Sequence, residues 1–423
     1  MLARLFLLLS LFLTGTAAEA ETIVVHAGRL IADASRPAAG PSTITIVDGR
    51  IQSVTSGLTP APQGARLIDL STRTVLPGLI DTHVHLSSDP GGDYWREAVE
   101  SDEYWTLIGV KNARITARAG FTTVRDLGSP QQVGFALARG SSEGLIVGPR
   151  IVSSGPAISI IGGHGDVTGF RPEVIAALGA DNTCTGPEQC AARVREFARA
   201  GAQVIKFMAT GGVLSQQARG LEAHFTDEEM RAIVTAARSL GLKVAAHAHG
   251  ARGIEAAARA GVDSIEHGTF ADARAIQAMR ASNTAFVPTL MAFTGIREGL
   301  GRNIFTPPVA AKVRETLELV GRAARAARAA GVPVVFGTDA AVFEHGRNAQ
   351  EFAMLVELVG MSPAEALASA TTAAARLLGM ENEIGRIAPG YSADLIAVAG
   401  DPLRDIRQLE RVEFAMVRGR TVE

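Results

Sequence analysis

The sequence predicts an α/β fold, a (β/α)8 TIM barrel with a small β-sandwich domain formed by both ends of the chain. Two observations predict it. Between residues 77 and 382, segments rich in Val and Ile alternate with segments that have helical spacing, which is typical of βα units around a parallel sheet. Residues 21–76 and 383–423 instead contain short β-type runs separated by Gly, Pro and Asp-Gly turns. An open doubly wound sheet is the alternative, but no glycine-rich dinucleotide fingerprint favours it.

Residues 1–20 have the features of a secretory signal peptide. Arg4 precedes the apolar run of residues 5–13, and the small-residue sequence TAAEA ends at Ala20. We therefore expect cleavage after Ala20 and export to the periplasm or the medium, with an uncleaved anchor as the alternative. The apolar run is shorter than the ~20 residues of a membrane-spanning helix, so no stable membrane anchor is expected after cleavage.

Composition and charge narrow the class of partner. The chain of 423 residues is 47% hydrophobic, enough for a core larger than that of a single barrel of roughly 250 residues. Its 41 Lys and Arg residues nearly balance 43 Asp and Glu residues, and no basic block stands out. A nucleic-acid partner is therefore not expected.

Both cysteines lie close together in the sequence. Cys184 and Cys190 are separated by the loop-like segment TGPEQ. In the oxidising compartment that a signal peptide implies, this spacing favours a disulfide. Two free or buried thiols are the alternative, because closeness in sequence does not guarantee the Cα separation that a disulfide needs.

Eight barrel strands are expected, and ionisable residues gather at their C-terminal ends. The active sites of such barrels lie at that end, so these side chains should meet in one place. Each alone could be a structural group, but six together indicate a metal site. The expected strands read LPGLIDTHVH, FTTVRDLG, RIVSSG, VIKFMAT, KVAAHA, SIEHG, TAFVPTL and VPVVFGTD. The six residues are His83, His85, Lys206, His247, His267 and Asp339.

Strand geometry suggests how these residues bind metal. Side chains alternate along a strand, so His83 and His85 point the same way and can chelate one cation. The same alternation directs Lys206 into the barrel interior, where an unpaired ammonium is costly. Reaction of Lys206 with carbon dioxide would give a carbamate, which can bridge two cations. Imidazole and carboxylate ligands suit zinc best, with manganese, cobalt or iron as alternatives.

The motifs that carry these residues resemble those of the amidohydrolase superfamily. They are DTHVH at 81–85, IKFMATGG at 205–212, AAHAHG at 245–250, IEHGT at 265–269 and GTDA at 337–340. The resemblance covers nearly all of the mature chain. Within the superfamily, the chain is most similar to the imidazolonepropionase-like branch, which includes bacterial Xaa-Pro and Xaa-Arg/Lys dipeptidases and hydrolases of the amide in ochratoxin A.

The resemblance implies a centre of two divalent cations, with zinc as the expected metal. Deaminases of the superfamily generally lack the bridging lysine, which argues against deamination. Relatives also suggest a homo-oligomer, such as an octamer. The implied ligands are His83, His85 and Asp339 for the deeper cation, His247 and His267 for the outer one, and Lys206, as N6-carboxylysine, between them.

Two residues are expected to act on the substrate. Two cations would lower the pKa of a bridging water far enough to supply hydroxide near neutral pH. Asp339, beside that hydroxide, is the expected general base and later the proton donor to the leaving amine. His164 lies in a glycine-rich loop after the third strand, where relatives use a histidine against the substrate carbonyl, so it is expected to stabilise the oxyanion. A loop histidine with no catalytic role is the alternative.

Further residues are weaker candidates. His224 and His345 lie on the loops after strands four and eight, where substrate contact and a solvated loop are both plausible. His249 is expected to support a ligand rather than bind metal. Arg125 and Asp126 are expected to form a structural ion pair, with substrate contact as the alternative because they lie at the barrel rim. An aromatic lid, an oligomer contact or helix packing would each explain the aromatic residues after the first strand, Tyr94, Trp95, Tyr104 and Trp105.

The sequence therefore predicts a hydrolase of amide bonds that releases the C-terminal amino acid from a dipeptide or an N-acyl amino acid. Alternatives within the fold are hydrolysis of aryl-acyl amino acid amides such as ochratoxin A, or of a lactone or cyclic amide. A scaffold or ligand-binding barrel is the alternative outside enzymes, although such proteins typically lose metal ligands. Serine hydrolysis is not expected, because the order of residues in the sequence gives no obvious catalytic triad.

Overall fold

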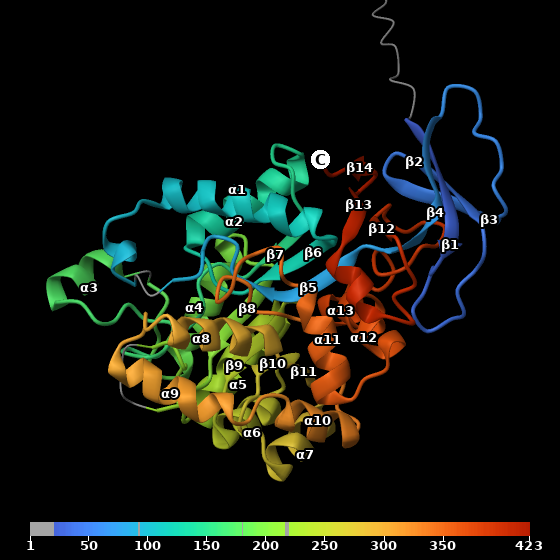
Figure 1. Ribbon diagram of the computed structural model, residues 1–423. Coiled ribbons are helices and arrows are strands. Elements are labelled where there is room, and N and C mark those ends of the chain that lie inside the picture. Colours follow the sequence, from blue (N-terminus) through green and yellow to red (C-terminus); the bar gives the residue numbers. More distant parts are fainter. Residues whose placement is uncertain (1–20, 92–93, 180, 216–219) are drawn as a thin grey trace, which may run out of the picture.

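The computed structural model describes residues 21–423 apart from 92–93, 180 and 216–219. The expected signal peptide, residues 1–20, lies outside the described residues. Figure 1 shows a barrel with a β domain attached at one side, built from the blue N-terminal and red C-terminal strands. No helix in the described part of the chain is long and apolar enough to cross a membrane.

In the described residues, the barrel wall consists of seven parallel strands and one irregular segment. β5 to β7 pair in one set and β8 to β11 in another, and a bridge between Ile158 and Phe207 joins the two sets. All residues of β5, β6, β8 and β10 are buried, which explains their near-continuous apolar runs. The strands are β5 (Leu79–Val84), β6 (Phe121–Asp126), β7 (Arg150–Ser153), β8 (Val204–Met208), β9 (Lys243–Ala248), β10 (Ser264–His267) and β11 (Ala285–Val287).

The eighth expected strand, VPVVFGTD at 332–339, closes the barrel without forming a regular strand. It bridges β11 through Val334, and the residue that follows it, Ala340, bridges β5. At its end Asp339 adopts a left-handed φ of 63°, which interrupts the extended backbone that a ladder of hydrogen bonds requires. The segment thus reaches both neighbours through isolated bridges and scattered hydrogen bonds, such as that from the Thr82 N–H to the Phe336 carbonyl at 3.2 Å, rather than through a regular ladder.

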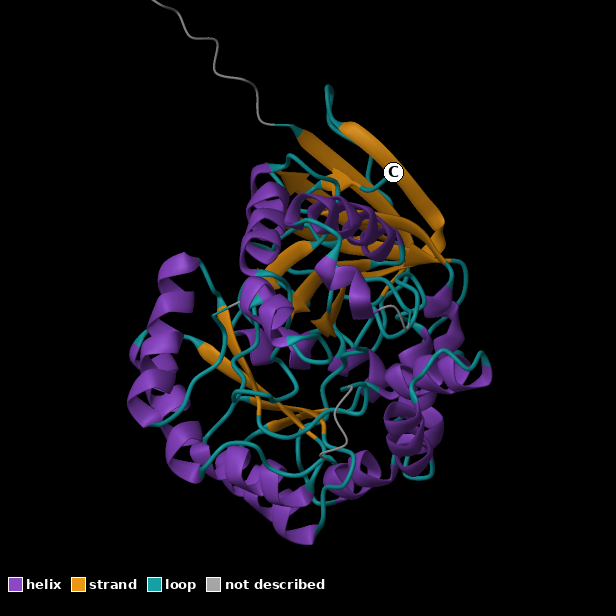
Figure 2. Ribbon diagram, turned by 90° about the vertical axis from the view of Figure 1, so that its left-hand side faces the viewer, coloured by secondary structure: helices purple, strands orange, loops and turns teal. Residues whose placement is uncertain are grey.

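Helices surround the barrel and cover the outer side of its strands (Figure 2). Local sequence signals set their ends: α5 begins with a capping box formed by Thr226 and Glu229, and left-handed glycines end α2, α6 and α13. The helices are η1 (Tyr94–Ala98), α1 (Asp102–Arg118), α2 (Gln131–Glu143), α3 (Pro172–Leu178), α4 (Pro187–Ala200), α5 (Asp227–Ser239), α6 (Ala251–Ala260), α7 (Ala273–Ser282), α8 (Leu290–Gly301), α9 (Pro307–Leu317), α10 (Arg322–Ala329), α11 (Gln350–Met354), the π-helical η2 (Leu355–Val359), α12 (Pro363–Ser369), α13 (Thr372–Leu378) and η3 (Ile406–Glu410).

Both ends of the chain build one β domain, as predicted. In the described chain its sheet has the order β14-β13-β12-β4-β1-β2-β3, and pairing of β12 with β4 joins the two ends. The turn at Gly49 packs against the turn at Arg418 from the opposite end of the sheet, so a Cβ on Gly49 would lie 2.6 Å from the Arg418 carbonyl oxygen. The sheet thus curls around a core shared by both halves. Its strands are β1 (Thr22–Leu30), β2 (Ser42–Val47), β3 (Arg50–Ser56), β4 (Arg66–Pro77), β12 (Leu395–Val398), β13 (Val412–Val417) and β14 (Arg420–Thr421).

Candidate metal centre

The residues predicted as metal ligands surround one cavity of about 400 Å³ at the C-terminal ends of the barrel strands. Neighbouring histidine rings in this cavity have centroids 4.4 to 5.4 Å apart. The tertiary structure therefore brings together residues that are up to 256 positions apart in the chain (83 to 339). The predicted ligands that line the cavity are His83, His85, Lys206, His247, His267 and Asp339.

His83, His85 and Asp339 form the tightest group. The Nε2 atoms of His83 and His85 lie 3.4 and 3.1 Å from Asp339 Oδ1, and ligand atoms of all three lie within 4.8 Å of one another. The other ring nitrogens are already engaged: Nδ1 of His83 donates to Glu266 Oε2 at 2.8 Å, and Nδ1 of His85 donates to the Gly128 carbonyl at 2.9 Å. Both histidines are thereby oriented with Nε2 toward a shared position, the arrangement that metal-binding histidines need.

His247 and His267 lie beside this group. Their ring centroids are 4.7 Å apart, and the His267 centroid lies 5.1 Å from that of His83. His267 Nδ1 shares a hydrogen bond of 2.7 Å with Thr289 Oγ1, which leaves Nε2 as its ligand atom. His247 Nε2 lies 3.3 Å from the Gly211 carbonyl, which leaves Nδ1. Each imidazole thus keeps one nitrogen for a cation.

Lys206 lies inside the barrel, as strand alternation predicted. Its side chain is 1% exposed, and Nζ lies 3.5 Å from His83 Nε2. Burial lowers the pKa of the Lys206 ammonium to about 8, although the carboxylates of Glu266 and Asp339 oppose that effect. A buried amine that loses its proton this readily can act as a nucleophile.

The electrostatics of the site fit a divalent cation. Burial, together with neighbouring positive charge, lowers the pKa of His83 to about 4 and holds the pKa values of His247 and His267 well below the usual range. Burial would also lower the pKa of His85, but its hydrogen bond to Asp339 raises it. Burial would raise the pKa of Asp339, yet the adjacent histidines hold it well below its ordinary value. His83, His247 and His267 are therefore neutral, and neutral imidazoles beside an ionised carboxylate are a donor set that such a cation binds.

Sequence reasoning missed Glu266, which orients His83. Its Oε2 accepts from His83, and its Oε1 accepts from Arg125 Nη2 at 2.9 Å, with both side chains fully buried. Burial would raise the pKa of Glu266, but the Arg125 guanidinium and His83 lower it to about 2. The expected ion pair between Arg125 and Asp126 is therefore wrong, and Asp126 instead accepts from Ser129 Oγ at 2.6 Å. The sequence did contain a signal for this role, because Glu266 lies within an apolar strand and a buried carboxylate needs a cationic partner.

His164 lines the same cavity from the loop after β7. Its ring centroid lies 4.4 Å from that of His247, and its Nδ1 is 2.7 Å from Ser215 Oγ. A Cβ on Gly212 would lie 2.2 Å from the His164 ring, so this close approach requires glycine. Burial lowers the pKa of His164 to about 3, which keeps the imidazole neutral. A neutral, oriented imidazole here can donate a hydrogen bond into the cavity.

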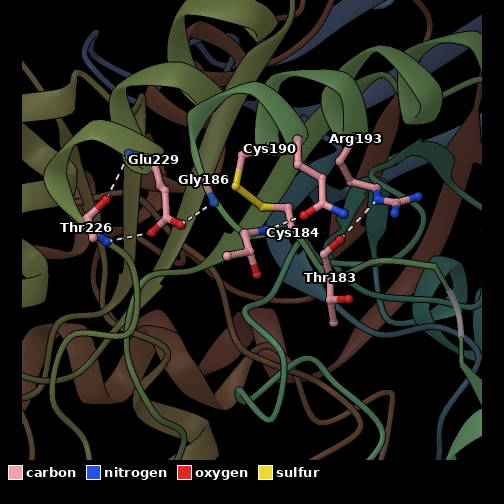
Figure 3. Close-up of a disulfide and its surroundings, with 9 residues drawn as sticks. Thr183, Cys184, Gly186, Cys190, Arg193, Thr226 and Glu229 are labelled. Atoms are coloured by element: carbon pink, nitrogen blue, oxygen red, sulfur yellow. Dashed lines mark hydrogen bonds between the residues drawn. A yellow bond between two sulfur atoms is a disulfide. The ribbon is translucent and has the colours of Figure 1, made fainter.

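A disulfide braces the loop that carries His164. Cys184 and Cys190 are bonded, with Cα atoms 5.0 Å apart, and tie the preceding segment to α4 (Figure 3). The Cys184 N–H donates to the Ser159 carbonyl at 3.0 Å. The side chain of Asn182 donates to the Gly165 carbonyl at 2.7 Å. The disulfide-bonded segment thus holds the loop on both sides of His164.

The other candidate histidines have different surroundings. His249 lines the cavity, with Nδ1 2.8 Å from Thr269 Oγ1. His224 and His345 are not among the described residues that line it. His345 Nε2 donates to the Ser88 carbonyl at 3.2 Å and its Nδ1 lies 3.4 Å from Thr116, so His345 holds the cavity-lining segment at Ser88 rather than facing a ligand. The expected direct contact of His224 and His345 with substrate thus has no support in this geometry.

The aromatic residues after β5 do not form a lid in the described structure. Trp95 and Tyr104 are 49% and 39% exposed, and Trp105 packs against the main core. Arg96 stacks over Trp105, with its guanidinium carbon 5.1 Å from the ring centroid. The side chain of Tyr94 lies outside the described ones. The three described side chains are absent from the cavity lining, so helix packing and surface contact are the explanations that remain.

Away from the histidines, the cavity wall is apolar. Two other charged side chains among the described residues line it, Asp89 and Arg302. Asp89 is already held by Lys111 Nζ at 2.5 Å and by Asn112 Nδ2 at 3.1 Å. The cavity is therefore shaped for a molecule with a substantial apolar part. The apolar residues of the wall include Val213, Leu214, Phe293, Ile296, Ile304 and Phe305.

Known proteins resemble this chain in sequence and in fold. The model of the amidohydrolase family matches residues 74–422. The ochratoxinase of Aspergillus niger is 32% identical over 416 residues, which cover 92% of this chain and 83% of that protein. A crystal structure of a Xaa-Pro dipeptidase with methionine bound in its active site has a TM-score of 0.88 and 36% identity, covering 95% of this chain and 99% of that chain. A prolidase complexed with N-methylphosphonate-L-proline has a TM-score of 0.85 and 32% identity, with coverage of 95% and 99%.

Proposed function

Because the chain belongs to the amidohydrolase family and is a hydrolase of amide bonds, we propose that it cleaves dipeptides or N-acyl amino acids and releases the C-terminal amino acid. The observation that carries this proposal is the convergence of His83, His85 and Asp339 within 4.8 Å, beside the buried Lys206. The named relatives support the substrate class, since one is a Xaa-Pro dipeptidase that holds a free amino acid, methionine, in its active site.

The proposed ligands form two groups joined by Lys206. Two divalent cations, with zinc as the first choice, would supply Lewis acidity to the amide carbonyl and to an attacking water. The neutral Lys206 amine would attack carbon dioxide, form an N–C bond and release one proton, which leaves a carbamate with two oxygens as ligands. The other ligands would be His83, His85 and Asp339 on one side and His247 and His267 on the other.

Two side chains would carry the proton and the developing charge. The ionised Asp339 carboxylate takes a proton from the attacking water and then donates it to the leaving amine nitrogen. If the Ser215 hydroxyl donates to His164 Nδ1, the neutral ring carries its proton on Nε2. That N–H would donate to the substrate carbonyl oxygen as negative charge develops on it.

A second candidate function is the hydrolysis of aryl-acyl amino acid amides, because the cavity wall is largely apolar. A dipeptide also has a free N-terminal ammonium group, so a site for dipeptides should contain a carboxylate that is not already paired. Of the described carboxylates that line the cavity, Asp89 is paired with Lys111 and Asp339 belongs to the metal-ligand group. An acyl group without charge would suit this wall better than an N-terminal amino acid. The relative named ochratoxinase supports this candidate at the level of the family.

The experiment combines metal analysis with a substrate panel. Purified protein is assayed on Xaa-Pro, Xaa-Arg, Xaa-Lys, Xaa-Phe and N-aroyl-Phe amides before chelation, after chelation and after metal is restored. We expect about two metals per chain, release of the C-terminal amino acid, and loss of activity on chelation. The preferred substrate separates the two candidates.

Variants provide the control. His83→Ala should lose metal and activity, whereas His26→Ala, on β1 with its side chain bonded to the Thr59 carbonyl, should lose neither. Metal-free protein that remains active would rule out the proposed mechanism. Metal-loaded protein that cleaves no amide would redirect the proposal to lactones and cyclic amides, and protein with neither metal nor turnover would favour a scaffold.

We also propose that the chain is exported, cleaved after Ala20 and assembled as a homo-oligomer. The disulfide supports export, because such bonds persist in oxidising compartments. The mass of the mature protein and its N-terminal sequence test the cleavage, and light scattering tests the assembly. An intact leader on protein recovered from the cytoplasm would contradict export.

A further inference from the structure

Arg302 stands at the edge of the proposed active-site cavity. It follows α8 directly, and its backbone N–H donates to the Glu298 carbonyl at 3.1 Å, which continues the helix by one residue. The side chain is exposed to solvent and lines the same cavity as the candidate metal ligands. A guanidinium at this place can meet a substrate without being buried before the substrate arrives.

Arg302 forms no direct ion pair within the described structure. The hydrogen bond from Arg347 and, less strongly, the charge of Arg302 lower the pKa of Glu298. The acid closest to Arg302 along α8, Glu298, is occupied by Arg347, whose Nη1 and Nη2 lie 3.1 and 2.9 Å from its two oxygens. Arg347, by comparison, pairs with both Glu298 and Glu344. The Arg302 guanidinium is therefore available for direct pairing with a carboxylate of a ligand.

The carboxylates of the cavity do not neutralise Arg302 either. Asp89 is bound by Lys111 and Asn112, and Asp339 lies among the histidines of the candidate metal centre. The described cavity thus has a cationic edge, an apolar wall and a cluster of metal-binding donors. A substrate whose anionic group is bound by Arg302 would lie along the apolar wall, with its reacting amide at the metal-binding donors.

We propose that Arg302 binds the α-carboxylate of the substrate's C-terminal residue, and that this residue has an apolar side chain. The inference rests on the proposed function, since only a substrate cleaved at its C-terminal residue brings that carboxylate. A guanidinium can bind a carboxylate through two parallel hydrogen bonds, which fixes orientation as well as charge. The apolar side chain would pack on Phe293, Ile296 and Phe305, which line the cavity close to Arg302 in the sequence.

The test compares two compounds that differ only in this carboxylate, N-benzoyl-L-phenylalanine and N-benzoyl-L-phenylalaninamide. Arg302→Met should lower kcat/KM for the free acid by about 10- to 100-fold, mainly through KM, and leave that for the carboxamide unchanged. Arg302→Lys should recover part of the loss, since it restores the charge without the paired hydrogen bonds. Arg297→Met is the matched control, because Arg297 is exposed on the same helix but does not line the cavity.

Two results would overturn the inference. One is a wild-type protein that treats the acid and the carboxamide alike, and the other is an Arg302→Met variant that loses both activities equally. If the wild type hydrolyses neither compound, the wider substrate panel decides whether the proposed function stands. Calorimetric binding of the same two compounds to the metal-loaded protein then tests Arg302 separately: preference for the acid that disappears in Arg302→Met supports the inference, and its absence overturns it.

Discussion

Several residues at the candidate metal centre hold a backbone conformation that their side chains disfavour. The φ angles of His267, Asp339 and Thr289 are 70°, 63° and 48°. For a β-branched residue such as Thr289, this left-handed conformation costs on the order of 1–3 kcal/mol. The hydrogen bond between Thr289 and His267 offsets part of that cost and orients the ring. Strain is thus concentrated where side-chain direction matters for the proposed chemistry.

Thr289→Val tests whether the Thr289 hydroxyl prepares His267 for metal. The change keeps the shape of the side chain but removes the oxygen that lies 2.7 Å from His267 Nδ1. Loss of such a partner typically weakens metal affinity by about 10- to 100-fold. The chelator concentration that removes half of the bound metal should fall accordingly. Thr269→Val is the matched control, because Thr269 makes the equivalent bond to His249, which is not a proposed ligand. Equal metal loss in both variants would count against these assignments.

At the scale of elements, α8 begins against a buried carboxylate. The oxygens of Glu351, from α11, accept the N–H groups of Leu290 and Met291 at 2.9 and 2.6 Å. These are the first residues of α8, whose N–H groups have no partner within the helix. Because Thr289 immediately precedes them, Glu351 also fixes the backbone that presents the Thr289 hydroxyl to His267. A buried acidic side chain 61 residues from Leu290 in the sequence thereby shapes the candidate site.

Glu351 should impose a pH dependence on stability. Burial, opposed by the two backbone hydrogen bonds, raises the pKa of Glu351 from 4.5 to about 8. Between these values the folded protein holds a proton that the unfolded chain has lost, so the free energy of unfolding falls as the pH rises, by about 1.4 kcal/mol per pH unit. Glu351→Gln cannot titrate. The stability of the wild type relative to Glu351→Gln should therefore decline from pH 5 to pH 8.

Denaturant titrations at several pH values measure this difference. Glu365→Gln is the control, because hydrogen bonds from Ser362 lower the pKa of Glu365 and no decline is expected over that range. A constant difference between the wild type and Glu351→Gln from pH 5 to pH 8 would show that Glu351 is ionised in the folded protein.

At the scale of the whole molecule, connections outside the strand ladders complete the barrel. The set β5–β7 meets β8–β11 through the Ile158–Phe207 bridge, next to the segment braced by the disulfide. On the other side, the irregular segment 332–340 joins β11 to β5. The two segments that close the barrel both carry candidate active-site residues, His164 on the first and Asp339 on the second. Barrel closure and site geometry therefore depend on the same contacts.

Removal of the disulfide should weaken both stability and activity. Cys184 and Cys190 close a loop with a sequence separation of 6, and opening a loop of this size costs about 2 kcal/mol in the chain-entropy description. The double variant Cys184→Ser/Cys190→Ser should melt at a lower temperature. It should also have a lower kcat, because the segment no longer holds the loop of His164 firmly. A reductant should shift the melting temperature of the wild type toward that of the variant and leave the variant itself unchanged. Identical melting curves would contradict this role.

Local patterns in the sequence were sufficient to predict the fold class, the β domain and the residues of the candidate site. The fold class follows from the alternation of buried strands and helices. The shared β domain follows from the short β-type runs, separated by turns, at both ends of the chain. Strand alternation, and the location of barrel active sites at the C-terminal ends of the strands, predicted which six residues would meet. The structure brings these six residues together. Their roles as metal ligands stay a prediction that metal analysis can test.

Only the tertiary structure decided how charges are paired and how the barrel closes. Glu266 and Arg125 are 141 residues apart, and local periodicity cannot tell which buried carboxylate faces which guanidinium. The same holds for Arg302, whose availability depends on Glu298 being taken by Arg347 from 49 residues away. The composition of the eighth barrel segment predicts a strand, yet in the structure isolated bridges join it to its neighbours and Asp339 has a positive φ. Hydrophobic patterning indicates which residues are buried. Which charged side chains pair, and which direction the backbone takes, depend on contacts that form only when distant segments pack.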